Sequence, residues 1–533
     1  MPEIKEAQRN APDLKPLQLY RQPAAVQRCC GPGHCGVHSP VRLCCLCSYD
    51  GPDDHPTRWR HDSGDLVTAA INLGVPHPTG YPLYTMIAHL FTALPGAEPA
   101  RNVNLLSVLA AALAVGAIFW AAYRLIVARE NAGLLAVVAA WAAATLYGFG
   151  ELLWSQATIA EVYSLNVLLM AMLLVVAISF PSRVRPYALA VLFGFGLAHH
   201  LTIVLLLPAL WPYVYTVRRW LTVRRSIQIG FCLLPGLLMY LYIPISAGTH
   251  PVPNWGQPDS ISGFVWLVSG AAYRGYLSAV PLSHLIQRFS AWAGIWVRDL
   301  GVVGLALALL GLAHGLETDR RFTWFGLTYV ALLTGYAMFY ATSDSYLYLL
   351  PAAAIIALWV AQGGIVALHG LQHWARLSSR RWLVATAGVV ILAALPLTSI
   401  ATRFQAMDLS ADREAYIFAE RVLDAAAPSA IVVSSGDAQT FPLWYLRYGL
   451  GKRPDVVVVD RNLLAFDWYR RDLGWRHPDL AAVARAVDAQ EAATMLVLEE
   501  GHRRPVHLTY ADDELLDLAS WTYDDPLFTL SQE

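Results

Sequence analysis

The chain has 533 residues, of which 56% are hydrophobic and only 14% charged, with a net charge of −1 and a mean hydropathy of +0.43. Soluble domains carry about 25% charged residues, so this composition excludes an ordinary soluble domain. The near-zero net charge argues against nucleic acid as a partner. Because the apolar residues lie in blocks long enough to cross a bilayer, the sequence predicts a polytopic α-helical membrane protein.

Residues 1–60 do not share this pattern. Six of the seven cysteines lie between Cys29 and Cys47, in a spacing that matches no standard zinc template, so we predict no metal site there. A disulfide cluster is an alternative, and no run is apolar enough to span a membrane. Cysteine codons read one base later encode alanine or valine, so we interpret residues 25–57 as a frameshifted reading of an apolar span. Disorder is the other interpretation of residues 1–60.

Apolar stretches follow through most of the remaining chain and predict ten or eleven spans in a domain that covers residues 61–404. The first stretch is short enough to be a buried or interfacial segment. The stretches lie near residues 81–96, 103–126, 132–149, 161–180, 187–200, 201–217, 226–246, 290–313, 322–341, 345–368 and 383–400.

Arginines are distributed unevenly between the connecting loops. Thirteen of them fall in alternate loops, whereas the opposite loops after residue 102 hold only Arg274 and Arg288 before the last predicted span. The positive-inside rule therefore places the Arg-rich loops in the cytoplasm and the opening stretch and C-terminal tail outside. The thirteen are Arg124, Arg129, Arg183, Arg185, Arg218, Arg219, Arg224, Arg225, Arg320, Arg321, Arg376, Arg380 and Arg381.

Polar motifs gather on the predicted outer side. Polar groups near the hydrocarbon are costly, and five such groups on one face favour a single outer site over five unrelated loops or caps. The motifs are "DSGDLVTAAINLGVPHPTGYP" from Asp62, "GELLWSQATIAEVYSLN" from Gly150, "AHHLT" from Ala198, "HPVPNWGQPDS" from His250 with "YRGY" from Tyr273, and "TSDSYLYLLP" from Thr342.

The character of the chain changes after residue 404. "SAIVVSSG" is typical of a buried strand, "DAQTFPLWYLRYGLG" of a helix that ends at glycine, and "PDVVVVD" of a second buried strand. This order predicts a small α/β domain over residues 405–533. The "SSGD" turn lacks the glycine spacing of a nucleotide-binding loop. We predict a small outer domain that holds the acceptor or closes the cavity; the alternative is a scaffold with no role in the active site.

The opening motif, followed by "RNVNLLS", "EVYSLN", "HHLT", "NWGQP" and "SDSYLYLLP" in this order, resembles the family of domain of unknown function 2723. That family includes relatives of protein O-mannosyltransferases and belongs to the GT-C superfamily of multi-spanning glycosyltransferases. The resemblance covers residues 61 to about 370 and, more loosely, 435–460. It implies an inverting transfer of one sugar, with mannose as the candidate, from a polyprenyl-phosphate donor to a protein or glycan hydroxyl.

The resemblance also implies catalytic acids in the first outer loop. Transfer to a hydroxyl needs a base, and GT-C enzymes carry an acid at the position of Asp62 and Asp65. We predict Asp62 as the base and Asp65 as its orienting group or as the second candidate, since the family commonly has Glu at the position of Asp65. The alternative is that Asp62 merely caps the helix that starts at "GDLVTAA".

Other outer residues are candidates for substrate contact. A donor phosphate needs cations or hydrogen-bond donors, for which His199, His200 and Arg274 are candidates. Two adjacent helical residues point about 100° apart, so we expect only one histidine, His200, to face the site and no metal between them. Candidate substrate contacts, each with a purely structural alternative, are His77, Tyr81, Glu161, Tyr163, Asn254, Trp255, Asp344 and Tyr346.

The sequence thus predicts a glycosyltransferase of the bacterial cytoplasmic membrane with its site and C-terminal domain outside. We expect it to need no cofactor, because the lipid-linked sugar is a substrate, and to have the bilayer, this donor and an acceptor as partners. A transporter or flippase is the alternative, although it predicts ionisable residues deep in the spans and internal repeats, which the sequence lacks. A non-catalytic assembly protein is a third possibility.

Overall fold

The computed structural model describes residues 62–129, 133–217, 220–375 and 381–531. Trp59–Glu533 form one compact unit. The predicted segment 1–60, with its cysteines and its interpretation as a frameshift, lies outside the described residues.

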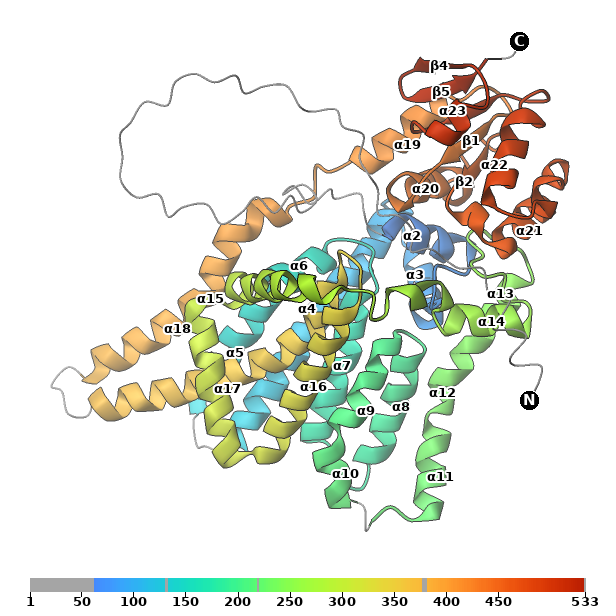
Figure 1. The fold of residues 1–533 in the computed structure, drawn as a ribbon. Helices are drawn as coiled ribbons and strands as arrows, with labels where there is room; N and C mark the ends of the chain where they lie inside the picture. Colours follow the sequence, from blue (N-terminus) through green and yellow to red (C-terminus); the bar gives the residue numbers. More distant parts are fainter. Residues whose placement is uncertain (1–61, 130–132, 218–219, 376–380, 532–533) are drawn as a thin grey trace, which may run out of the picture. The chain divides into compact units, whose positions relative to one another are not determined.

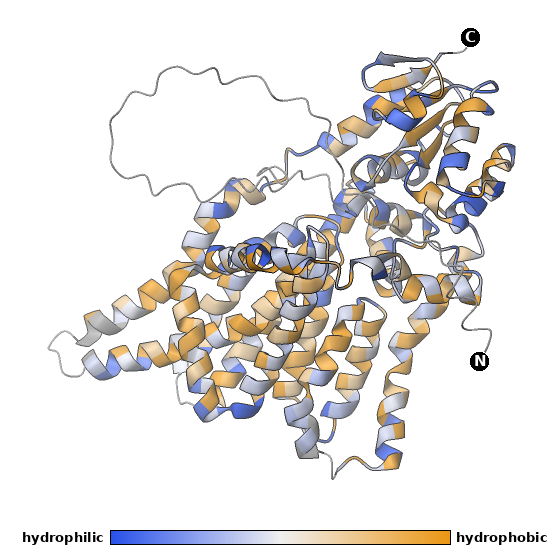
Figure 2. Ribbon diagram, viewed as in Figure 1, coloured by the Kyte–Doolittle hydropathy of each residue, from blue (hydrophilic) through white to orange (hydrophobic). Residues whose placement is uncertain are grey.

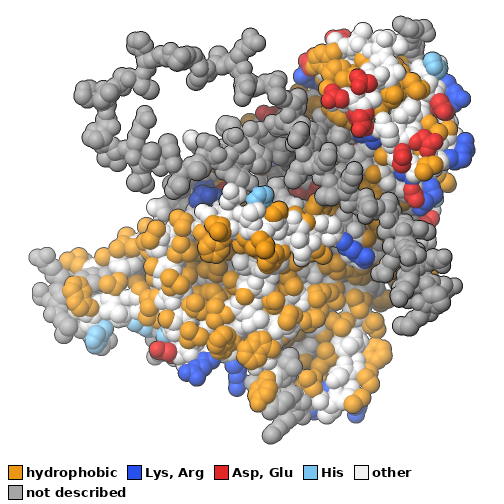
Figure 3. Space-filling view, viewed as in Figure 1, with side chains coloured by type: hydrophobic (Ala, Val, Ile, Leu, Met, Phe, Trp, Pro, Cys, Tyr) orange, Lys and Arg blue, Asp and Glu red, His pale blue; other side chains and the backbone are white. Residues whose placement is uncertain are grey.

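Long apolar helices form most of the described chain (Figure 1). Their residues are predominantly hydrophobic in Figure 2, and Figure 3 shows hydrophobic side chains over the visible face of this bundle. Six helices are long and apolar enough to cross a membrane. They are α4 (Pro99–Val127); α11 (Val223–Cys232), α12 (Leu234–Leu237), η2 (Leu238–Leu241) and α13 (Tyr242–Ala247) together; η4 (Leu282–His284) with α15 (Leu285–Thr318); α16 (Arg320–Phe339); η5 (Ser345–Leu349) with α17 (Leu350–Ala375); and α18 (Arg381–Met407).

The predicted fold class is confirmed, but fewer helices meet the length of a full span than the ten or eleven predicted. A pair of helices bent by 62° makes a seventh span, and three other apolar segments have only 10–17 residues. Hydropathy marks these segments as apolar but does not reveal where turns interrupt them. The pair is α5 (Gly133–Gly148) and α6 (Glu151–Ala157), and the shorter segments are α7 (Tyr163–Ser179), α8 (Arg185–Leu197), and η1 (Leu201–Leu205), α9 (Leu206–Ala209) and α10 (Trp211–Val217) in succession.

The bend between α5 and α6 is completed by a carboxylate from another helix. The first backbone N–H groups of a helix have no acceptor within it. Asp299 of α15 supplies one, because its Oδ1 accepts from the backbone N–H of Glu151 at 2.7 Å and of Leu152 at 3.4 Å. Asp299 is only 4% exposed, and α15 is kinked just after it at Gly301. A buried acid inside a membrane helix therefore has a structural role here.

Small residues allow α15 and α17 to touch backbone to backbone. A Cβ at Gly311 would come within 1.9 Å of the Trp359 carbonyl oxygen, and a Cβ at Gly363 within 1.8 Å of the Leu307 carbonyl oxygen. Helices in membranes associate through such close packing because lipid tails are as apolar as the side chains. These two glycines thus set the distance between two central helices.

Two outer loops are joined to each other by backbone hydrogen bonds at the end of the bundle. The first carries α2 (Ser63–Asn72) and α3 (Pro82–Thr92), and the second precedes α14 (Ile261–Val268) and η3 (Ala271–Tyr276). Val75 donates its N–H to the Pro253 carbonyl at 2.8 Å and accepts from the Trp255 N–H at 3.1 Å, so the loops form a short parallel bridge. The predicted apolar stretch 81–96 is the 11-residue helix α3, which is too short to span.

The C-terminal part is an α/β domain, and the predicted strand–helix–strand unit is confirmed. Its five strands have the order β2-β1-β3-β5-β4, with β2, β1 and β3 parallel and the other pairs antiparallel. Ile431 of β1 pairs with Val457 of β2 and with Val506 of β3. The elements are α19 (Glu414–Ala425), β1 (Ile431–Ser434), α20 (Asp437–Trp444), η6 (Tyr445–Gly449), β2 (Val457–Asp460), η7 (Leu463–Ala465), α21 (Asp467–Arg476), η8 (Pro478–Leu480), η9 (Val483–Arg485), α22 (Ala489–Leu498), β3 (Val506–Leu508), α23 (Asp513–Leu516), β4 (Trp521–Asp524) and β5 (Leu527–Leu530).

One hydrophobic core joins this domain to the outer loops. It runs from Leu66 and Val67 of α2 through Trp255 to Val432 and Val458 of the sheet. A second core fills the helical bundle. The loops that carry the opening motif therefore share one core with the C-terminal domain.

The contact between α15 and α17 generates a prediction. Gly363→Ala places a methyl group where a backbone carbonyl lies, so we expect it to lower the free energy of unfolding by about 1–3 kcal/mol, the usual cost of overpacking. Thermal unfolding in detergent measures this. Gly370→Ala is the control on the same helix, since nothing lies within 4 Å of a Cβ there. Equal melting temperatures for the two variants would contradict the assigned contact.

Candidate functional site

Asp62 lies at the N-terminus of α2 with its carboxylate turned away from the helix. Its carbonyl accepts the first helical hydrogen bond, from the Leu66 N–H at 3.0 Å, but its side chain caps no N–H group. Its Oδ2 lies instead 3.3 Å from Nε2 of His77, and its side chain is 38% exposed. Asp62 therefore occupies the cap position while its carboxylate remains open to a ligand.

Asp65 is the buried anchor of the site. It is fully buried, one turn into α2, where its carboxylate accepts three N–H groups. Oδ2 accepts from the His77 backbone at 3.0 Å and contacts His77 Nδ1 at 2.8 Å, and Oδ1 accepts from the Trp255 indole at 3.0 Å. A buried carboxylate is stable only when so paired. The predicted orienting role fits this position better than direct contact with a substrate.

His77 bridges the two acids. Burial lowers the pKa of its imidazole, but Asp62, Asp65 and Glu161 outweigh burial and raise that pKa to about 9. The cationic ring in turn opposes the desolvation that raises the pKa of Asp62. His77 is 4% exposed, so it can hold Asp62 in place but offers little surface to a substrate.

The turn around His77 is rigid, as its prolines and glycine predict. Gly80 has φ 83° and donates to the His77 carbonyl at 2.9 Å, and Pro82 lies in the first turn of α3. The Tyr81 hydroxyl donates to the Pro78 carbonyl at 3.2 Å, and its ring contacts His77 edge-on at 5.1 Å between centroids. The bend therefore aims both rings at Asp62.

Glu161 approaches Asp62 from another loop. Its Oε1 accepts the backbone N–H of Asp62 at 3.1 Å, and it is 5% exposed. Burial, and then the charge of Asp62, raises the pKa of Glu161 well above its usual range. This predicted substrate contact is thus a near neighbour of Asp62.

The two histidines that follow α8 have different hydrogen-bond partners. His199 is buried, with Nε2 2.8 Å from the Val162 carbonyl. His200 accepts from the Thr202 N–H at Nδ1, so its neutral ring carries a proton on Nε2. This ring lies among Tyr81, Tyr163 and Tyr348, with centroids 5.9–6.1 Å apart. His199 also contacts Tyr81 and Tyr84, with ring centroids 6.5 Å and 6.2 Å apart, so the expectation that only His200 faces the donor stays a prediction.

The remaining predicted site residues differ in how deeply they are buried. Arg274 is exposed on η3, with Nη2 2.8 Å from Ser269 Oγ. Trp255 is enclosed between His77 and the C-terminal residues Phe441 and Trp468, so it lies behind Asp65. Asn254 donates to Asp472 of α21 at 3.3 Å. Their predicted contact with sugar remains a prediction.

Two predicted residues that precede α17 differ in exposure. Asp344 is exposed, and its charge is among the causes that raise the pKa of Asp62, so it lies within electrostatic reach of that residue. Tyr346 is half-buried and packs against the core of the bundle. Among the residues described, no group of three or more His, Cys, Asp or Glu side chains could hold a metal ion.

The C-terminal domain brings residues that the sequence analysis did not select. Asp437, the first residue of α20, has Asp62 as the strongest charge acting on it. Tyr273 of η3, which lies outside this domain and was also not selected, is within electrostatic reach of Asp62, Tyr81 and Asp437. Asp472 accepts from Asn254 and from Arg476 Nε, the latter at 2.8 Å. The "SSGD" motif, which ends at Asp437, was the feature of the sequence from which this residue could have been selected.

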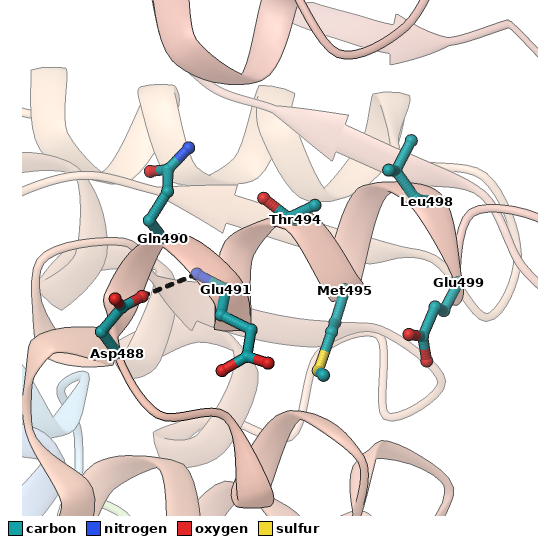
Figure 4. A pocket seen from close by; sticks show the side chains of 7 residues that line it. All are labelled: Asp488, Gln490, Glu491, Thr494, Met495, Leu498 and Glu499. Carbon is teal, nitrogen blue, oxygen red and sulfur yellow. Dashed lines mark hydrogen bonds between the residues drawn. The ribbon is translucent and has the colours of Figure 1, made fainter.

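A surface depression elsewhere in the domain is a poor candidate. It measures about 400 Å³ along α22, and Figure 4 shows its side chains projecting from that helix. Asp488 Oδ1 accepts the Glu491 N–H at 2.8 Å while Glu491 accepts the Val487 N–H at 2.6 Å. These acids thus form a helix cap.

The hydrogen bond from Trp255 to Asp65 can be tested by its removal. Trp255→Phe leaves a buried carboxylate short of a donor, so we expect a loss of about 1–3 kcal/mol in the free energy of unfolding. Trp468→Phe is the matched control in the same aromatic cluster, because its buried indole N–H has no hydrogen-bond partner among the described residues. Calorimetry in detergent should show a larger fall in melting temperature for Trp255→Phe. Equal falls would refute the bond.

Comparison with known proteins agrees with this architecture. Residues 62–224 match the family model of the protein O-mannosyl-transferase TMEM260 N-terminal domain, and residues 415–515 match TMEM260-associated domain 2. The chain is 28% identical over 445 residues to protein O-mannosyl-transferase TMEM260 of Mus musculus, covering 76% of this chain and 60% of the relative. It is 23% identical over 468 residues to the Dictyostelium discoideum protein, covering 78% and 56%.

The chain thus spans somewhat more than half the length of these relatives. Among solved structures, ArnT from Cupriavidus metallidurans in the apo state aligns with a TM-score of 0.50 at 13% identity, over 89% of this chain and 95% of ArnT. That likeness concerns the fold. The chain is accordingly an integral membrane protein of GT-C fold and is similar to the TMEM260 protein O-mannosyl-transferases.

Proposed function

We propose that this protein transfers a mannosyl group from a polyprenyl-phosphate carrier to a hydroxyl group of a protein, on the outer face of the membrane. The observation that carries this proposal is the Asp62 carboxylate. It is accessible, and its Oδ2 lies 3.3 Å from Nε2 of His77. His77 is in turn held by the buried carboxylate of Asp65. The similarity to protein O-mannosyl-transferases supports the choice of mannose and of a protein acceptor.

The chemistry that such a site supports is a single displacement. The acceptor oxygen bonds to the anomeric carbon while the bond from that carbon to the phosphate oxygen breaks, and the carrier phosphate leaves with the electron pair. Asp62 takes the proton of the acceptor hydroxyl. Burial raises the pKa of Asp62, and His77 opposes this effect and so favours the ionised form of the base. The product is inverted at the anomeric carbon.

The donor phosphate requires hydrogen-bond donors near Asp62. The Nε2–H of neutral His200 and the phenols of Tyr81 and Tyr163 lie on the aromatic side of the site. Arg274 supplies a guanidinium on the exposed η3. Guanidinium and imidazole N–H groups suit phosphate oxygens. A glycan hydroxyl remains the alternative acceptor.

The membrane side determines the kind of donor. Nucleotide sugars are confined to the cytoplasm, so an enzyme with an outer site needs a lipid-linked sugar. The arginine asymmetry supports an outer site, because the Arg-rich loops lie at the other ends of the helices. The bacterial cytoplasmic membrane stays a prediction from composition.

A transporter is less well supported. Transport through the bundle calls for ionisable groups along a path at mid-membrane. The described acids and histidines of the site lie in loops or at helix ends, and the buried Asp299 is occupied by the N-terminus of α6. A non-catalytic assembly role would leave the arrangement of Asp62, His77 and Asp65 without a use.

Removal of the base is the direct test. Asp62→Asn should reduce transfer of mannose to a protein acceptor by at least about 10²-fold, the lower range for a general base, with an unchanged melting temperature. Radiolabelled polyprenyl-phosphate mannose and purified protein provide the assay. Asp259→Asn, an exposed acid of the second outer loop, is the control. Full activity in Asp62→Asn would remove the proposed base, and loss confined to Asp65→Asn would move its role to Asp65.

Membrane orientation is tested by thiol labelling. The seven native cysteines are replaced by alanine, and single cysteines are introduced at the exposed positions Asp259 and Ser410 or at Ser182 and Thr222. An impermeant maleimide should label the first pair in right-side-out vesicles and the second pair in inside-out vesicles. The reverse pattern would bring nucleotide sugars within reach of the site and would rule out the argument for a lipid-linked donor.

A further inference from the structure

One outer arginine is not used by the proposed mechanism. Arg274 and Arg288 are the two arginines in the predicted outer loops between residue 102 and the last predicted span, and only Arg274 is assigned to the donor phosphate. Arg288 lies in the first turn of α15. A cation there is unfavourable for its own helix, because the N-terminus of a helix carries a partial positive charge. The guanidinium of Arg288 therefore calls for partners on other elements.

Those partners lie at the end of α16 and in the turn that follows it. Nη2 of Arg288 donates to the carbonyls of Ala337, at 3.1 Å, and Tyr340, at 2.8 Å, and it also donates to the Ser345 hydroxyl. The last carbonyls of a helix have no partner within it, and a cation beside them is stabilising. The guanidinium carbon also lies 5.3 Å from the centre of the Trp292 ring, one turn further along α15. Arg288 thus fixes the end of α16 and the following turn against α15.

The end of α16 is paired in turn with the loop that carries Arg274. Tyr340 forms an antiparallel bridge with Leu277, and the N–H of the residue after Tyr340 donates to the Tyr276 carbonyl at 3.0 Å. The Leu277 N–H donates to the Arg274 carbonyl at 3.2 Å. The backbone of Arg274 is therefore joined, through this bridge, to a segment that Arg288 fixes.

The turn after α16 leads to a tyrosine that contacts His200. Tyr348 belongs to η5, which begins at Ser345, the hydroxyl partner of Arg288. The Tyr348 ring packs edge-on against the His200 ring, with 6.1 Å between centroids. His200 and Arg274 are the imidazole and the guanidinium proposed for the donor phosphate. Arg288 is therefore hydrogen-bonded to a segment that reaches both of them.

We propose that Arg288 is a positioning residue that fixes the geometry of the donor-phosphate site, by holding in place the segments that carry Arg274 and Tyr348. The inference rests on the proposed function, because that function assigns the phosphate to His200 and Arg274. Arg288 acts through these residues and need not touch the ligand, since its Nη2 is already shared among three acceptors. Loss of its guanidinium should weaken binding of the phosphate head group and leave binding of the prenyl chain unchanged.

Direct binding of the carrier tests this inference apart from transfer. Two probes are titrated with the full-length protein in detergent: a polyprenyl phosphate with a fluorophore at the far end of its prenyl chain, and the matching polyprenol. Arg288→Met keeps an unbranched side chain without donors, so the phosphate should bind about tenfold more weakly, as for loss of a hydrogen bond to a charged group. Binding of the polyprenol should not change. Arg288→Lys should lie between, because its ammonium still carries three N–H groups.

A second variant decides the question if Arg288→Met does not fold. Ser345→Ala leaves the guanidinium in place and removes one of its three acceptors, so it should weaken phosphate binding by about threefold, as for a neutral hydrogen bond. Arg298→Met is the matched control on the same helix. The exposed guanidinium of Arg298 pairs with Glu151 at 2.9 Å, and such surface pairs contribute little, so this variant should bind both probes as wild type does.

Several outcomes would overturn the inference. They are a wild type that does not bind polyprenyl phosphate, a folded Arg288→Met or Ser345→Ala variant that binds it as tightly as wild type, an equal loss of polyprenol binding, and an Arg288→Lys variant that binds no better than Arg288→Met. The expected binding pattern together with an absence of mannose transfer by wild type would refute the proposed function instead.

Discussion

The structure around the site depends on the satisfaction of one buried charge. The Asp65 carboxylate has no solvent contact, and an unpaired charge in such surroundings costs several kcal/mol. Its three N–H donors come from the first outer loop and from Trp255 in the second. Both loops must therefore take their observed positions for α2 to fold as it does, and the bridge between Val75 and Asn254 follows from this requirement.

The same constraint extends into the C-terminal domain. Trp255 can reach Asp65 only because its ring is enclosed by Phe441 and Trp468 on the far side. Asn254 is held by Asp472, which is itself paired with Arg476. The position of Asp62 thus depends on packing and hydrogen bonds contributed by the C-terminal domain.

Sequence reasoning succeeded where the signal is local. Hydropathy predicted a bundle of apolar helices, and alternation of strand and helix patterns predicted the C-terminal unit around β1 and β2. Asp62, Asp65 and His77 lie within one short motif, so their proximity could be predicted, as could the rigid bend at Gly80. The number of full spans could not, because turns such as that between α5 and α6 interrupt an apolar run without changing its composition. Asp437 and Tyr273 were not selected for another reason: Asp437 comes near Asp62 only through the packing of α20 on α2, and Tyr273 only through the placement of η3, so neither proximity is local in the sequence.

The cap that Asp299 provides for α6 has a consequence for the biogenesis of the protein. Glu151 and Leu152 are made long before Asp299, which follows them by nearly 150 residues in the sequence. During synthesis, the backbone N–H groups in the first turn of α6 must therefore donate to water or lipid headgroups until α15 has entered the membrane. We expect α6 to stay at the membrane interface until α15 is inserted. The helices before and after α6 would then pack around it at a late stage of assembly.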